Sequence, residues 1–232
     1  MEKFLVFLNE NSLYLLLFVG GIGTFCWLLV FRKRIRAGWF SVLLLSVLHI
    51  FFGVLSVKLF AFLESPSEKF GSSMSLFGAV FFMPCLYFAG SKIFKRNTRQ
   101  VFDLFTVPLV FTLACARVNC LLTGCCKGMI IPFVGDGTIR WPTREAELLF
   151  YAVFLSLIII RISRDRSNGE IYPLYLLSYG FFRFFVEGFR ESSAESIFHL
   201  AHIWAVIAVC AGAAFYFEIR HQSKKRGQLK ND

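Results

Sequence analysis

The sequence has little charge and no long polar segment. Asp, Glu, Lys and Arg make up 17% of its 232 residues, against about 25% in an average soluble domain. Hydrophobic residues account for 56% of the chain, and 30 residues are Phe. Because most of the length is apolar, no sizeable soluble domain fits, and soluble enzymes and soluble binding modules are excluded.

Strict alternation of polar and apolar residues is also missing, which disfavours a membrane β-barrel. Continuous apolar runs are present instead, and about 20 helical residues are enough to cross a bilayer. We predict an all-α polytopic membrane bundle, with residues 1–232 forming a single integral membrane domain. Its seven transmembrane helices are expected at residues 12–31, 39–62, 72–90, 101–124, 147–162, 172–187 and 197–217.

The distribution of basic residues predicts the orientation of this bundle. Of the 25 Lys and Arg, 16 lie in segments 32–38, 91–100, 161–170 and 218–232, and only 6 lie in the alternating set of segments. Basic loops stay in the cytoplasm, so the amino terminus is predicted outside and the carboxyl terminus inside. A cleavable signal peptide is not expected, because no small-residue cleavage site precedes the first span.

Two polar segments remain outside the predicted spans. Residues 125–146, on the external side, contain Gly-Asp-Gly at 135–137 and a Trp-Pro pair, which are turn-forming residues. We expect this segment to form a small external cap. The net charge of +10 is explained by topology-determining loops and by a basic cytoplasmic tail at 218–232 near anionic lipid, so no nucleic acid is expected as a partner.

Charged residues inside membrane spans are costly and usually face the bundle interior. For Asp103, at the start of the fourth span, capping of that helix is one explanation. Arg117 and Arg183 each lie one to two turns before the outer end of a span, and Glu187 and Arg190 follow Arg183 at helical spacing. An internal pair with Glu187 satisfies one arginine, not all three. The excess positive charge indicates a bound phosphate, such as a phospholipid headgroup.

Three cysteines cluster at the outer end of the fourth span, in Cys120-x4-Cys125-Cys126. A disulfide, a metal site, and small apolar residues at a tight turn are the three interpretations. The C-x2-C spacing of structural zinc sites is absent, and no metal or cofactor is predicted, although His199 and His202 come near the outer end of the seventh span. A disulfide is feasible on the oxidising side of the membrane.

Three blocks give the chain a resemblance to the bacterial prolipoprotein diacylglyceryl transferases. ARVNCLLTGCCKG at 116–128 resembles the family signature, in the Gly-Cys-Cys form of its divergent members. WPTREAELLF at 141–150 is similar to the His-Pro-Ser/Thr-Gln-Leu-Tyr-Glu block, and YGFFRFFVEGFRES at 179–192 to the Tyr-Gly-x-x-Arg-Phe-x-x-Glu-x-x-Arg block. The first half of the chain matches in topology and in a Gly-Ala pair at Gly78.

The resemblance implies a reaction and a set of site residues. The family transfers the diacylglyceryl group of phosphatidylglycerol to the cysteine thiol of a prolipoprotein signal peptide in the bacterial inner membrane, and glycerol phosphate leaves. Catalytic roles are thereby implied for Arg117, Arg183, Tyr179 and Glu187. Substrate-binding roles are implied for Arg117, Arg183, Arg190, Asn119 and Gly124.

Several positions depart from the family pattern. The histidine that the family carries before the third span is missing from SSMSLFGAVFF at 72–82, and Trp141 replaces the histidine of the second block. Ala146 replaces the tyrosine of that block, and Cys125 stands where the signature carries an acid. Three alternatives therefore stay open: a paralogue with another acceptor or headgroup, a non-catalytic lipid-binding or transport protein, and a thiol redox protein.

Overall fold

The computed structural model describes residues 11–67, 69–71, 73–131, 139–164, 169–191 and 199–228. Within these ranges the chain folds into helices joined by short connections, and its only strand-like pairings are two isolated bridges. The all-α prediction is confirmed. The described helices are α2 (Ser12–Val30), α3 (Arg32–Ile35), α4 (Trp39–Glu64), α5 (Leu76–Ile93), α6 (Thr98–Thr123), α7 (Thr143–Ser163), α8 (Ile171–Glu187) and α9 (Leu200–Gln228).

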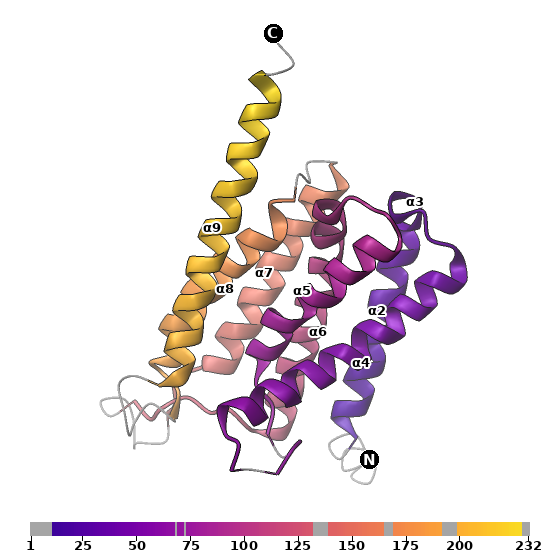
Figure 1. Ribbon diagram of the computed structural model, residues 1–232. Helices are drawn as coiled ribbons and strands as arrows, with labels where there is room; N and C mark the ends of the chain where they lie inside the picture. The colour runs from indigo at the N-terminus through magenta and orange to yellow at the C-terminus, as the bar shows by residue number, and fades with distance from the viewer. Residues whose placement is uncertain are drawn as a thin grey trace.

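Six of these helices are long and apolar enough to cross a membrane. They correspond to six of the seven predicted spans, with ends that differ by a few residues except at the end of α9. The remaining predicted span is α8, which has 17 residues and lies alongside α9 (Figure 1). The count of seven spans and the inside–outside orientation therefore stay predictions.

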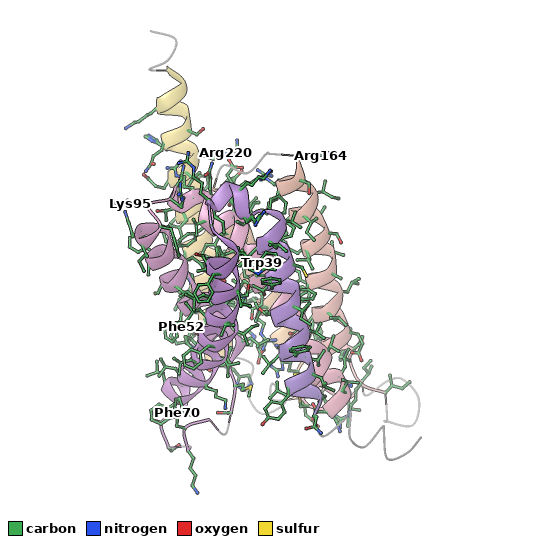
Figure 2. All side chains as sticks on the ribbon, turned by 90° about the vertical axis from the view of Figure 1, so that its right-hand side faces the viewer. Trp39, Phe52, Phe70, Lys95, Arg164 and Arg220 are labelled. Atoms are coloured by element: carbon green, nitrogen blue, oxygen red, sulfur yellow. The ribbon has the colours of Figure 1, made fainter. Side chains whose placement is uncertain are left out.

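Helix α6 is the centre of the bundle. Two thirds of its apolar span is buried (67%), whereas the other five candidate spans are 17–39% buried. Large hydrophobic side chains such as Trp39, Phe52 and Phe70 point outward instead (Figure 2). In lipid this arrangement costs nothing, because apolar side chains need no shielding from hydrocarbon.

Small residues bring two helix pairs into close contact. A Cβ atom added to Gly78 of α5 would lie 2.1 Å from the backbone oxygen of Ser56 on α4. A Cβ atom at Gly180 of α8 would lie 2.6 Å from the backbone oxygen of Ala205 on α9. Glycine is needed at both positions because membrane helices associate through such close backbone packing.

Asp103 caps a helix, but not its own. Asn97 caps α6, its side chain accepting a hydrogen bond from the N–H of Arg99. The carboxylate of Asp103 instead accepts from the N–H groups of Gly169 and Ile171, at 2.6 and 2.8 Å, and so satisfies the start of α8. Asp103 therefore caps α8 and not its own helix, α6. These two hydrogen bonds link α8 to the central helix.

One end of the bundle gathers basic residues from the segments predicted to be cytoplasmic. Lys95, Arg164 and Arg220 lie at that end in Figure 2. Helix α2 begins at the opposite end, whereas α9 extends past the basic end (Figure 1). The segment 218–232, expected to be a solvated tail, is helical through Gln228.

Candidate active site

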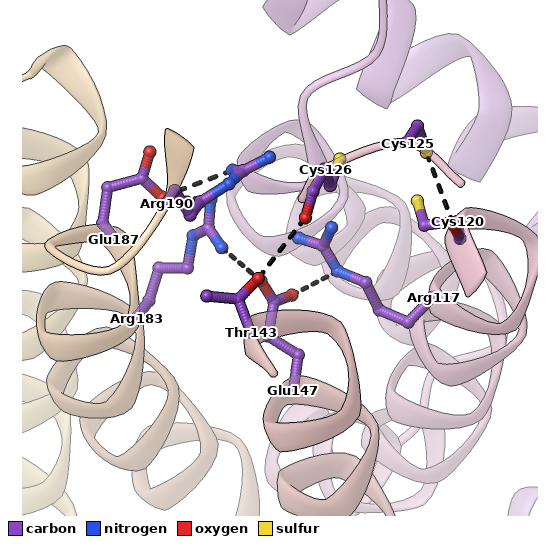
Figure 3. A network of polar contacts seen from close by, with 9 residues as sticks. All are labelled: Arg117, Cys120, Cys125, Cys126, Thr143, Glu147, Arg183, Glu187 and Arg190. Atoms are coloured by element: carbon purple, nitrogen blue, oxygen red, sulfur yellow. Dashed lines mark hydrogen bonds and ion pairs between the residues drawn. The ribbon is translucent and has the colours of Figure 1, made fainter. Parts of the chain in front are cut away.

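Five charged residues converge at the end of the bundle where α6 and α8 finish and α7 begins (Figure 3). They are Arg117 of α6, Glu147 of α7, Arg183 and Glu187 of α8, and Arg190 just beyond it. The first four residues are only 3–5% exposed. Such a concentration of buried charge is expensive in a membrane protein, so this cluster is the candidate functional site.

Glu147 connects the two buried arginines. Its Oε1 atom pairs with Nη1 of Arg183 at 2.6 Å, and its Oε2 atom pairs with Nε of Arg117. Arg183 extends the chain of contacts through Nη2 to Oε2 of Glu187 at 2.5 Å. Arg190 pairs with the same Glu187 oxygen at 3.3 Å. Each carboxylate is therefore shared by two guanidinium groups.

Helix geometry explains why these residues meet. Arg117 and Arg183 lie near the carboxyl ends of α6 and α8, and Glu147 lies near the amino end of α7. Cations are favoured at helix carboxyl ends and anions at amino ends. Glu187 lies one turn after Arg183 on the same face, as the i,i+4 spacing predicted. The antiparallel arrangement of α7 against α6 and α8 brings these ends together.

The five residues of the network by themselves carry one excess positive charge, because three guanidinium groups share two carboxylates, and the carboxyl of Glu64 lies within electrostatic range of Arg183 and Glu187. A pair with Glu187 was expected to satisfy one arginine, but Glu187 contacts both Arg183 and Arg190, and Glu147 provides the partner of Arg117. Sequence reasoning missed Glu147. A signal was present, since Glu147 sits at the head of an apolar run in the second of the three blocks. A positive excess of one charge still leaves the site suited to an anion.

Tyr179 lies in the core directly below this network. It is 1% exposed, and its ring packs against Phe77, Tyr151 and Tyr175 at centroid distances of 5.5–6.3 Å. Among the described residues, the hydroxyl of Tyr175 has no hydrogen-bond partner, whereas the hydroxyl groups of Tyr151 and Tyr179 lie within reach of each other. Each of these hydroxyl groups can donate a hydrogen bond to a polar group that enters the site.

The predicted binding residues Asn119 and Gly124 have other surroundings. The side-chain oxygen of Asn119 accepts a hydrogen bond from the hydroxyl of Ser12 at 2.7 Å, which joins α6 to α2. Gly124 ends α6 with φ +70°, a left-handed conformation that glycine adopts without strain. The structure thus places Asn119 in a helix contact and Gly124 in the turn after the helix, not in the charged network.

The three clustered cysteines lie at the same end of α6, beside Arg117 (Figure 3). All are free thiols, and the sulfur atoms of Cys120, Cys125 and Cys126 lie within 4.8 Å of one another. The backbone oxygen of Cys126 accepts a hydrogen bond from the hydroxyl of Thr143 at 3.4 Å. That contact connects the cysteine turn to the first turn of α7, which carries Glu147 one turn later.

The environment of Cys126 favours its thiolate. A hydrogen bond from Cys120, followed by the charges of Arg190 and Arg117, outweighs burial and lowers the pKa of the Cys126 thiol to about 5. Thiolates are the reactive and metal-binding form of cysteine. The charges of Arg117 and Arg190 therefore act on the cysteine turn as well as on the two glutamates.

The described part of the segment predicted as an external cap covers this end of the bundle. Two isolated antiparallel bridges pair Gly128 with Arg190 and Ile130 with Arg140. A Cβ atom on Gly128 would lie 2.1 Å from the backbone oxygen of Trp141. The predicted turn at 135–137 lies outside the described residues. The bridge to Gly128 holds the backbone of Arg190 in place, three residues after Glu187.

Comparison with known proteins identifies relatives of this chain. A phosphatidylglycerol–prolipoprotein diacylglyceryl transferase of Cronobacter sakazakii is 28% identical, and the match covers 87% of this chain and 86% of that protein. A protein named phosphatidylglycerol–prolipoprotein diacylglyceryl transferase 2, from Clostridium perfringens, is 25% identical over 78% of this chain and 80% of its own length. A third relative, from Paracidovorax citrulli, reaches 33% identity over 47% of this chain.

The family assignment does not depend on these pairwise matches alone. The sequence profile named prolipoprotein diacylglyceryl transferase matches residues 9–218, nearly the whole chain. The matched region contains all the described helices up to most of α9, and every residue of the charged network. The resemblance drawn from the three sequence blocks is confirmed, and the chain belongs to the prolipoprotein diacylglyceryl transferase family.

Proposed function

We propose that this protein transfers the diacylglyceryl group of phosphatidylglycerol to the cysteine thiol of a prolipoprotein. The observation that carries the proposal is the buried network of three arginines and two glutamates with its positive excess. A phosphodiester carries one negative charge, which guanidinium groups pair with through hydrogen bonds to its oxygens. The family membership and the names of the relatives support the same reaction.

Arg117 and Arg183 are proposed to hold the lipid phosphate. Each guanidinium group presents several N–H donors in a fixed plane, which matches a phosphate oxygen pair. Hydrogen bonds to a charged partner contribute about 1.5–3 kcal/mol each, so two arginines supply much of the headgroup affinity. Glu147 and Glu187 act as positioning residues, because their carboxylates fix the directions in which the two guanidinium groups point.

The same arginines are proposed to accelerate the chemical step. The thiol releases its proton to solvent, its sulfur forms a bond to the terminal glyceryl carbon, the bond from that carbon to the phosphate oxygen breaks, and glycerol phosphate leaves with the electron pair. Negative charge grows on the leaving oxygen during this step. Donors that already face this oxygen stabilise the transition state more than the ground state, which is the general basis of electrostatic catalysis.

An apolar groove offers a place for the acyl chains. It has a volume of about 420 Å³ and runs between α7 and α8 from Ala146, next to Glu147, toward the middle of the bundle. Its lining is almost entirely hydrophobic, as acyl chains require: Ala146, Leu149, Phe150, Val153, Phe154, Leu157, Ser178 and Phe182. A lipid with its tails in this groove would present its headgroup to the arginines.

The membrane context agrees with this proposal. Six helices long enough to span a bilayer make the chain a multi-pass membrane protein. The charge distribution of the loops indicates that the network lies at the external face of a bacterial inner membrane. Prolipoprotein signal peptides carry their acceptor cysteine at that face, so the peptide and the phospholipid can reach the same site.

The decisive experiment is complementation of a bacterial strain depleted of its own transferase, with lipoprotein mass as the measurement. We expect a mass increase of one diacylglyceryl unit in cells that express this chain. A matched variant, Arg117→Ala with Arg183→Ala, should give no increase at equal expression. Absence of the mass increase with the well-expressed native chain would refute the proposed acceptor, and labelled phosphatidylglycerol that binds the double variant unchanged would refute the phosphate site.

A further inference from the structure

The cysteine turn forms a second reactive cluster that the arginine network does not use. Cys120 lies in the last turn of α6, and Cys125 and Cys126 follow directly after the helix. Their three sulfur atoms lie within 4.8 Å of one another, an arrangement that could hold a metal ion. The other four cysteines of the chain lie within helices and do not join this group.

We propose that Cys120, Cys125 and Cys126 form a three-thiolate site for a thiophilic metal ion of the zinc class, with a fourth position open to the acceptor thiol. The role of the acceptor thiol as fourth ligand rests on the proposed function, whereas the three-cysteine metal site does not. The site would activate the thiol at the place where the arginines hold the phospholipid.

The fold supplies the ligand arrangement that the sequence spacing lacks. Gly124 and Cys126 both adopt left-handed backbone conformations, with φ +70° and +55°. A left-handed non-glycine residue is uncommon and costs energy, and such residues concentrate at functional sites. Here the two turns fold the chain back over the end of α6, so that Cys125 and Cys126 reach Cys120. A paired C-x2-C motif is therefore not needed to bring three sulfurs together.

The distances suit tetrahedral coordination. Zinc–sulfur bonds of about 2.3 Å place neighbouring ligand sulfurs about 3.8 Å apart. The sulfurs here lie within 4.8 Å, so an adjustment of about 1 Å closes the site around an ion. Cysteine ligands select thiophilic ions over magnesium or calcium, which require oxygen ligands.

Three cysteine ligands are the number that an open zinc site uses. Structural zinc sites use four protein ligands, whereas catalytic sites use three and keep one position for water or substrate. Within the part of the chain that the structure describes, the group contains only the three cysteines, and neither His199 nor His202 joins it. The side chain of Cys125 is exposed, so a ligand can approach from outside.

The cluster is physically joined to the phosphate site. Thr143 donates a hydrogen bond to the backbone oxygen of Cys126, and Arg144 donates one to the backbone oxygen of Cys120 at 3.5 Å. Both residues belong to the first turn of α7, and Glu147 follows one turn later. Figure 3 shows the cysteines beside the guanidinium group of Arg117. A group bound to the metal would thus lie near a phosphate held by the arginines.

Metal binding would solve the problem of proton removal. A thiol that coordinates zinc loses its proton outright, so the proton leaves to solvent when the acceptor binds. The sulfur then forms its bond to the glyceryl carbon, the carbon–oxygen bond breaks, and the electron pair departs with glycerol phosphate. No oxidant is consumed. This role would replace the histidine that the chain lacks before its third span.

The first test measures metal content without any assay of transfer. The full chain is purified in detergent with a reductant and no chelator, and zinc per chain is measured by mass spectrometry. We expect one zinc ion per chain. Cys120→Ser with Cys125→Ser and Cys126→Ser should fall to less than about a tenth of that value. The matched control changes three exposed cysteines in the helices, Cys26→Ser, Cys85→Ser and Cys210→Ser, and should keep the ion.

Folding of the variants is checked by thermal unfolding. Because Cys125 is exposed, the single variant Cys125→Ser serves as a second test and should lose most of the metal while unfolding at the same temperature as native protein stripped of its metal. Zinc that persists in the triple variant, or native protein with no zinc, overturns the site. A disulfide among these cysteines in the native protein, found by thiol counting, overturns it as well.

The second test concerns the open position. The zinc is replaced by Co²⁺, whose sulfur-to-metal absorption reports each bound thiolate, and a peptide with a prolipoprotein cysteine is added. We expect the absorption to increase with this peptide and to stay unchanged with its Cys→Ser counterpart. An unchanged spectrum with both peptides overturns the fourth-ligand assignment. Transfer activity in metal-free protein also overturns it while leaving the proposed function intact, whereas metal binding without transfer counts against the proposed function alone.

Discussion

The strongest prediction concerns Glu147, the residue that links the two buried arginines. Glu147→Gln keeps the size and shape of the side chain and removes its negative charge. The excess positive charge of the network then rises from one to two, because three guanidinium groups share only Glu187. Arg183 retains that partner at 2.5 Å, whereas Arg117 loses the only carboxylate it contacts among the described residues. The substitution therefore leaves one buried charge unpaired.

The expected effect on stability is large. Removing one partner of a buried ion pair costs about 3–5 kcal/mol, since the remaining charge stays desolvated. For a chain of this size each kcal/mol lowers the unfolding temperature by roughly 2–4 °C, so a decrease of roughly 6–20 °C is expected. Activity should fall by about 100-fold, because a displacement of about 1 Å in a positioning group has that effect.

Two measurements on purified protein test this prediction. Thermal unfolding in detergent gives the stability change, and transfer from labelled phosphatidylglycerol to a cysteine peptide gives the activity. Glu145→Gln is the matched control, because Glu145 lies on the same helix, is 52% exposed, and contacts Arg144 only at 3.9 Å. Exposed pairs of this kind contribute about 0–1 kcal/mol. The control should therefore behave like the native protein.

Equal behaviour of Glu147→Gln and Glu145→Gln in both measurements would refute the reasoning. A stability loss without loss of activity would limit Glu147 to a structural role and remove it from the site. Loss of activity at native stability would instead show that the unpaired arginine finds another partner while the phosphate geometry is lost. Only the combined loss agrees with a network in which one carboxylate both stabilises and orients the arginines.

Three further predictions follow from the described contacts. Arg117→Lys keeps the charge but loses the planar pair of donors, so transfer activity should fall at least about tenfold with stability little changed, and Arg117→Ala should fall further. Asp103→Ala leaves two backbone N–H groups at the start of α8 without their acceptor, and thermal unfolding should show a loss of about 2–4 kcal/mol. Gly180→Ala introduces a Cβ atom 2.6 Å from the backbone of α9 and should lower the unfolding temperature by several degrees. Its control, Gly90→Ala, has no atom within 4 Å of the added Cβ and should be neutral or slightly stabilising.

The predicted spans agree with the helices because hydrocarbon forces the backbone to satisfy its own hydrogen bonds, and an apolar run of sufficient length therefore forms a helix. The helix ends were predicted less well. Helix α7 begins at Thr143, four residues before the predicted start, and α9 continues eleven residues past position 217. Polar residues beyond the apolar run can extend a helix into the aqueous boundary, so hydropathy does not mark where it ends.

Within the site, spacing along the sequence was sufficient to predict one ion pair but not the others. The pairing of Arg183 with Glu187 follows from their positions on one helix, since residues four apart lie on the same face. The pairing of both arginines with Glu147 joins three helices, and no spacing in the sequence predicts it. The sequence blocks nevertheless contained all the residues of the network, and the resemblance they carried was confirmed by the family match.

By itself, then, the sequence determined that this is a helical membrane protein of the diacylglyceryl transferase family with arginines below the surface, because length, hydropathy and residue type are local properties. Only the tertiary structure decided which carboxylate each arginine contacts, that Asp103 caps a different helix, and that Cys120 meets Cys125 and Cys126. These contacts depend on how helix ends from distant parts of the chain pack together and on two left-handed residues after α6. Packing of that kind arises from the whole bundle, and no single segment encodes it.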